Sequence, residues 1–153
     1  MTLLAAIRPD DWNPPLFLHL VGAMTLVGAL LLVAVSLAGA ARGGSVATLR
    51  LGFRGLLFAA LPAWIVMRIS AEWLASKENV DDDSPAWVDI GYMTSDTSFL
   101  LLIAATVCAG LAARRAGRDQ AQGGGLSVAV VVLTAITLVA YVVVIWAMTT
   151  KPT

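Results

Sequence analysis

The sequence predicts an all-α, polytopic membrane protein: an antiparallel bundle of four transmembrane helices forming a single domain over residues 1–153. Of these 153 residues 59% are hydrophobic and 13% are charged. The mean hydropathy is +0.84, which is too apolar for a soluble domain of this size. Four nearly continuous apolar runs, at 14–40, 53–74, 93–113 and 126–148, are each long enough to cross a hydrocarbon core of about 30 Å.

The first span begins at Pro14 and Pro15, because proline can open a helix but cannot continue one. Its only strongly polar side chain is His19. Gly22 and Gly28 are small residues of the kind that let transmembrane helices approach closely. We expect the loop that follows to extend over residues 41–50.

The second span, residues 53–74, contains a proline and two charges. Pro62 removes one backbone hydrogen bond, so we expect a kink just before Trp64. Arg68 and Glu72 lie four residues apart and therefore share one helix face. A charge inside a membrane costs about 3 kcal/mol on insertion scales, so other segments of the bundle must shelter this pair.

The remaining chain alternates polar connections with apolar spans. An acidic loop is expected over 75–92, with Trp87 and Tyr92 as interfacial anchors. The third span, 93–113, carries Asp96 in its first turn and leads into a basic, then glycine-rich linker. The fourth span, 126–148, is rich in valine and contains Tyr141.

Charge asymmetry predicts the orientation of the chain. The two connections that share one side of a four-span bundle hold six arginines, so that side is expected to face the cytoplasm. Nine of the ten acidic residues, all except Asp119, fall on the opposite side. Both termini are then extracytoplasmic, and the expected location is the plasma (inner) membrane.

Each span places a polar or ionisable group at nearly the same depth of the outer third. With 1.5 Å of rise per residue, Arg68 lies roughly 9 Å inside the outer boundary. The candidate polar cluster consists of His19, Arg68, Glu72, Asp96 and Tyr141. Simpler roles are also open. Arg68 could extend to the headgroups instead of pairing internally, His19 could be a hydrogen-bonded interface residue, and Tyr141 could belong to an aromatic belt.

Several chemistries find no support in the sequence. It contains no paired histidine or cysteine spacing for a metal, no phosphate-binding glycine loop and no serine nucleophile motif. Cys108 is the only cysteine, so an intrachain disulfide is excluded. Bis-histidine haem ligation would need two chains, because the chain has one histidine, and His19 with a methionine partner is the other arrangement that the sequence leaves open. A net charge of zero gives no attraction for nucleic acid.

The segment FLHLVGAMTLVGALLLV in the first span resembles the opening helix of small bacterial CopD-like and DUF2269-like integral membrane proteins, whose pattern reads FLHLLGAxxWVGG. His19, Gly22 and Gly28 match this pattern, whereas its aromatic residue and doubled glycine are absent. The resemblance implies a four-helix membrane bundle and haem or copper handling at His19.

These observations favour a non-enzymatic accessory or assembly subunit of a membrane complex. Its partners would be the lipid bilayer together with further copies of the chain or other membrane subunits. Two alternatives are a redox protein that binds haem or copper through His19, and a proton- or ion-coupled bundle in which Glu72 and Asp96 titrate and Arg68 tunes them. The sequence does not identify a cofactor.

Overall fold

The computed structural model describes residues 10–42, 45–78, 86–118 and 124–150, and every element in these ranges is helical. Four of its continuous helical segments are long and apolar enough to cross a membrane, which confirms the all-α prediction and the number of candidate spans. The elements are η2 (Asp10–Trp12), α1 (Asn13–Ala41), α2 (Val46–Gly55), η3 (Leu56–Ala60), α3 (Leu61–Glu78), α4 (Ala86–Ala116) and α5 (Gly124–Thr150).

The helices run past the ends that hydropathy predicts. Residues 46–50 of the expected loop belong to α2, and α4 begins at Ala86, so Trp87 and Tyr92 lie on a helix and not in a loop. Hydropathy marks the apolar part of a helix, whereas its ends are set by backbone hydrogen bonds. Lys77 in the last turn of α3 and Asp89 in the first turn of α4 also match the helix dipole. The acidic residues at 81–83 lie outside the described residues.

Pro62 is accommodated by a wider turn in a helix that continues. The turn η3 is π-helical, and the Leu61 N–H donates to the carbonyl of Leu56, five residues earlier. Proline has no N–H for the carbonyl four residues before it, and a π turn changes the bonding pattern at that point. The expected irregularity before Trp64 therefore takes the form of a π turn, and α2, η3 and α3 form one helical run from Val46 to Glu78.

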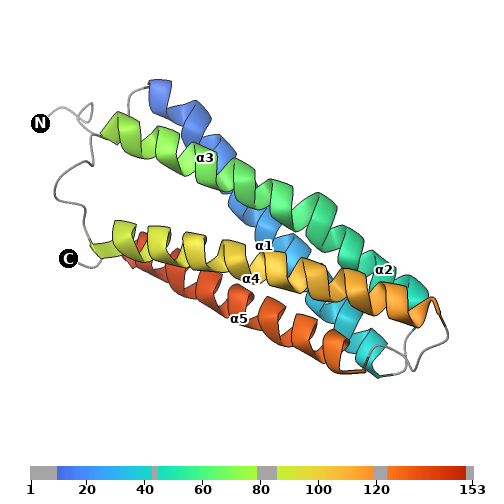
Figure 1. The fold of residues 1–153 in the computed structure, drawn as a ribbon. Coiled ribbons are helices and arrows are strands. Elements are labelled where there is room, and N and C mark those ends of the chain that lie inside the picture. The colour runs from blue at the N-terminus through green and yellow to red at the C-terminus, as the bar shows by residue number, and fades with distance from the viewer. Residues whose placement is uncertain (1–9, 43–44, 79–85, 119–123, 151–153) are drawn as a thin grey trace, which may run out of the picture.

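Successive long helical segments run in opposite directions, and the start of α1 lies at the same end of the bundle as the end of α5 (Figure 1). α1 packs along α3 and also against α5, while α4 packs along α5 and against α2. The backbones of α3 and α4 approach each other at only a few places. The α1–α3 pair and the α4–α5 pair consequently diverge toward the end that carries the termini (Figure 1).

The core contains a row of large side chains on α1, and part of this row lies against small residues of α2: Leu37 against Gly52 and Val33 against Gly55. Leu26, Leu30, Val33 and Leu37 recur at helical spacing on α1 and are all fully buried. The buried face of α4 is built largely from alanine. Small residues on one helix let large ones on another fill the space between them, which is how this interior reaches close packing.

Gly22 is the point at which α1 and α3 come closest. A Cβ placed on Gly22 would lie 2.8 Å from the backbone nitrogen of Met67 and 3.0 Å from its Cα. These are backbone atoms of α3, so they cannot move aside as a flexible side chain would. Gly28, two turns further along α1, has nothing within 4 Å of its Cβ position. The two glycines that match the CopD-like pattern therefore differ in their structural role.

We expect Gly22→Ala to lower the stability of the bundle by about 1–3 kcal/mol, because the added methyl group forces α1 and α3 apart. The matched control is Gly28→Ala, which adds the same methyl group in open space. Thermal unfolding in a mild detergent measures both variants. Equal melting temperatures for the two would show that the backbone contact at Gly22 does not limit the approach of the helices.

Candidate functional site

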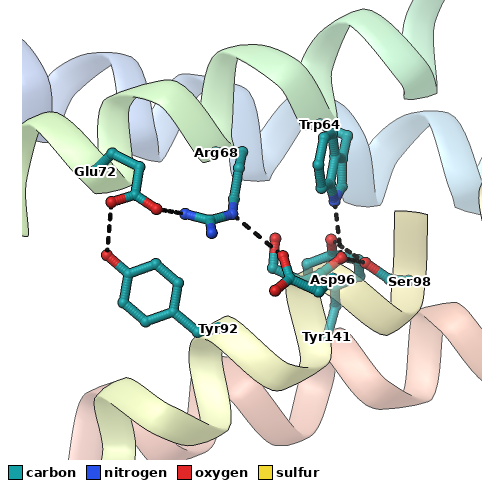
Figure 2. A network of polar contacts seen from close by, with 8 residues as sticks. Trp64, Arg68, Glu72, Tyr92, Asp96, Ser98 and Tyr141 are labelled. Carbon is teal, nitrogen blue, oxygen red and sulfur yellow. Dashed lines mark hydrogen bonds and ion pairs between the residues drawn. The ribbon is translucent and has the colours of Figure 1, made fainter. Parts of the chain in front are cut away.

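Arg68 connects α3 to α4 through its guanidinium group (Figure 2). One terminal nitrogen forms an ion pair with Glu72 one turn along α3, and Nε contacts Asp96 Oδ1 on α4 at 3.4 Å. The guanidinium carbon also lies 4.5 Å from the centroid of the Tyr92 ring, a cation–π geometry. The Tyr92 hydroxyl donates to Glu72 Oε2 at 3.4 Å. We call Arg68, Glu72, Tyr92 and Asp96 the Arg68 cluster.

Helical spacing explains why these four side chains meet. Arg68 and Glu72 are four residues apart on α3, and Tyr92 and Asp96 are four apart on α4, so each pair occupies one helix face. The two faces are turned toward each other where α3 and α4 diverge, and the long Arg68 side chain spans the separation (Figure 2).

The Arg68 cluster has a surplus of negative charge and is open on its carboxylate side. The Arg68 side chain is 22% exposed, whereas those of Glu72 and Asp96 are 56% and 65% exposed. One guanidinium faces two carboxylates, so the formal charge of the cluster is −1 when both acids are ionised. Arg68 is therefore the sheltered member, and the acids form the outer surface of the cluster.

Trp64, one turn before Arg68, forms a second bridge from α3 to α4. Its indole nitrogen donates to the backbone oxygen of Ser95 at 3.1 Å. Its ring stacks on Phe99, with centroids 4.4 Å apart and planes inclined by 23°. The aromatic pair separates the Arg68 cluster from the apolar core deeper in the bundle.

Tyr141 lies in a buried hydroxyl pair, apart from the Arg68 cluster. It is only 4% exposed, which rules out the position in an aromatic belt considered above. Its hydroxyl is 2.7 Å from Ser98 Oγ, and Ser98 Oγ donates to the backbone oxygen of Ser95 at 2.8 Å. Since a serine hydroxyl has one proton, Tyr141 donates to Ser98. This chain of hydrogen bonds joins α5 to α4.

His19 contacts α3 on the side that faces α1. Its Nδ1 lies 3.1 Å from the backbone oxygen of Met67. A carbonyl only accepts hydrogen bonds, so Nδ1 is the donor in this contact. The residue after Met67 is Arg68, which turns toward α4 (Figure 2). His19 is thus an interface histidine at the depth of the cluster, held on a different side of α3.

His19 is the one histidine available in the described residues as a metal or haem ligand. They contain no group of three or more histidine, cysteine, aspartate or glutamate side chains that could hold a metal ion. The hydrogen bond from Nδ1 to a carbonyl is an arrangement that ligating histidines often adopt. Within its described part this chain supplies one such imidazole, at His19.

Of the five residues that the sequence placed together, the structure joins Arg68, Glu72 and Asp96 and sets His19 and Tyr141 in separate contacts. Sequence reasoning missed Tyr92 as a member of the cluster, although its spacing of four from Asp96 was visible. It also missed Ser95 and Ser98. Serine is common in transmembrane helices, and nothing in their spacing indicates contacts with Trp64 and Tyr141.

Together these features define a small all-α bundle with an apolar exterior and an ion-pair cluster between two of its helices. Comparison with protein-family models, with curated proteins and with solved structures finds no match to this chain. The resemblance of the first span to CopD-like proteins therefore rests on its own residues alone.

We expect Arg68→Met to lower the melting temperature in detergent by a few degrees, since it leaves Glu72 and Asp96 without their cation. The effect is limited to about 1 kcal/mol because both acids are largely exposed. Arg54→Met, on an exposed arginine of the same helical run, is the control and should change little.

The triple variant Arg68→Met/Glu72→Gln/Asp96→Asn removes all three charges and should be more stable than Arg68→Met alone. Equal melting temperatures for Arg68→Met and the wild type would argue that the ion pairs contribute nothing to the bundle. A triple variant less stable than the single one would contradict the electrostatic explanation.

Proposed function

We propose that this chain is a non-enzymatic integral protein of the plasma (inner) membrane, with four spans and both termini outside the cytoplasm. In this proposal it acts as an accessory or assembly subunit of a membrane complex, either as a homo-oligomer or with other membrane subunits.

The apolar exterior supports membrane insertion. Large hydrophobic side chains are exposed on every long helix, among them Met24 on α1, Ile69 on α3, Leu100 on α4 and Trp146 on α5. Soluble monomers rarely expose contiguous apolar surface of this extent, whereas lipid chains would cover it. The candidate spans of 26–32 residues exceed the roughly 20 residues that a bilayer requires.

The distribution of charged and aromatic residues supports the orientation. Arginines lie at the end of the bundle away from the termini: Arg42, Arg50, Arg54, Arg114, Arg115 and Arg118. Tryptophans lie toward the opposite end, at or near the ends of helices: Trp12, Trp73, Trp87 and Trp146. Arginine-rich connections stay in the cytoplasm and tryptophans favour the membrane interface, so both patterns agree with extracytoplasmic termini.

The observation that carries the accessory role is that three polar side chains of the bundle form hydrogen bonds to other helices. His19 binds the backbone of α3, Trp64 binds the backbone of α4, and Tyr141 binds Ser98. Each contact fixes how two helices pack, which is a structural use of a polar group. Among the described residues these contacts pair no nucleophile with a base, and this favours an assembly role over catalysis.

Single-cysteine labelling tests the orientation, and the chain is suited to it because Cys108 is its only cysteine. In a Cys108→Ser background, Thr150→Cys should react with an impermeant maleimide in intact cells. Ser45→Cys and Arg118→Cys should react only after the membrane is opened. Labelling of Ser45→Cys in intact cells would reverse the proposed orientation, and release of the protein by a carbonate wash would refute membrane insertion.

Native electrophoresis tests the accessory role. The full chain, extracted in a mild detergent from the membrane in which it is normally expressed, should migrate in a complex larger than the 16.0 kDa protein with its detergent. Cross-linking in the intact membrane before extraction serves as the control for dissociation. A chain that stays monomeric in both measurements would contradict a role as a subunit.

A further inference from the structure

Two rows of exposed side chains border the Arg68 cluster. On α4 the row contains Met93, Asp96, Leu100, Ile103 and Val107, all exposed and spaced three or four residues apart. On α3 it contains Ile65, Ile69 and Glu72. Arg68 ties the two helices together between these rows, so they lie on the same side of the bundle. We call these eight residues the α3–α4 face.

Lipid covers the apolar members of this face, but it offers no cation to the exposed oxygens of the two acids, which share a single arginine. Asp96 lies three residues inside the apolar run of residues 93–113, which corresponds to roughly 4.5 Å along the helix. An ionised carboxylate at an apolar depth is costly when it faces hydrocarbon, so such residues normally have a partner or an aqueous contact. With 65% of its side chain exposed, Asp96 is accessible to such a partner.

Arg68 alone does not neutralise both carboxylates of the cluster. One of its two terminal nitrogens pairs with Glu72, and its contact with Asp96 is a long one through Nε. One cation facing two carboxylates leaves an excess charge of −1, which fits one additional cationic group beside Asp96. Because the guanidinium lies between the two acids, a single ion could not bind both without displacing it (Figure 2).

We propose that a transmembrane helix of a partner protein, carrying one lysine or arginine at the depth of Asp96, packs along the α3–α4 face. This inference rests on the proposed accessory role and names the chemistry of the partner. The basic side chain binds the exposed carboxylate of Asp96, and apolar residues on the same helix cover Met93, Leu100 and Ile69. The row on α4 from Met93 to Val107 extends roughly 21 Å, which suits a helix that lies along it.

A second copy of the chain fits this face poorly. A symmetric dimer places the same patch on both subunits. Two such faces would bring two clusters of charge −1 together, and each Arg68 is already engaged by its own acids. Charge complementarity thus favours a different chain with a basic residue.

The test uses the full chain in phosphatidylglycerol vesicles with synthetic transmembrane peptides as probes. The peptides are leucine–alanine helices. One carries a single lysine at the position level with Asp96, and the other carries glutamine at that position. The protein carries a donor dye at Thr150→Cys in the Cys108→Ser background, and the peptide carries the acceptor. We expect the lysine peptide to associate about tenfold more tightly than the glutamine peptide.

Substitutions test whether the preference for the lysine peptide arises at the α3–α4 face. Asp96→Asn should abolish it, and Glu72→Gln should reduce it. Asp11→Asn is the matched control, because it removes an acid from the same end of the bundle outside the face, where Asp11 pairs with Lys77 at 2.9 Å. An unchanged melting temperature shows that Asp96→Asn is folded. If Asp96→Asn does not fold, the weaker preference expected of Glu72→Gln tests the same face.

Three outcomes would overturn the proposal. Equal association of the two peptides removes the charge complementarity, and a preference that persists in Asp96→Asn places it elsewhere. The third is loss of the preference in phosphatidylethanolamine vesicles, which would assign the face to a lipid headgroup. None of these results bears on the mass of the native complex, which is the separate test of the accessory role. A monomeric native protein that still prefers the lysine peptide would instead refute the accessory role alone.

Discussion

The close contact between Gly22 and Met67 fixes the rotation of α3, and the position of the candidate site follows from that rotation. Gly22 brings the backbone of α1 against residue 67, and His19, one turn earlier, binds the Met67 carbonyl. Neighbouring residues on a helix point about 100° apart. With Met67 held against α1, Arg68 is turned toward α4, where it meets Asp96 and Tyr92.

The π turn before Pro62 has a role in the same arrangement. Gly52 of α2 packs against Leu37 of α1, and Met67 packs against Gly22. Four regular turns take about 14.4 residues, and these two contact points are 15 residues apart in sequence. One wider turn between them allows both to face α1. A single helical run can therefore follow α1 along most of its length, although it contains a proline.

The Arg68 cluster lies where the two helix pairs diverge, and this explains its unequal exposure. Trp64 and Phe99 close the space between α3 and α4 on the core side, whereas on the other side the backbones separate. The guanidinium occupies the narrow part, and the shorter acids remain at the surface. The excess negative charge of the cluster therefore lies on the outer surface of the bundle, where a cationic group of a partner can neutralise it. The hydroxyl pair of Ser98 and Tyr141 is inside and has no such surplus.

The sequence by itself determined the class of fold and the depth of each polar group. Apolar runs predicted four long helices, and a spacing of four residues predicted the pair of Arg68 and Glu72, since both depend only on position along the chain. The tertiary structure decided which groups at one depth meet. Asp96 joins Arg68, while Tyr141 turns to Ser98 and His19 to Met67. The physical reason is that hydropathy fixes the position along the helix axis, whereas rotation about that axis is set by contacts such as Gly22 with Met67.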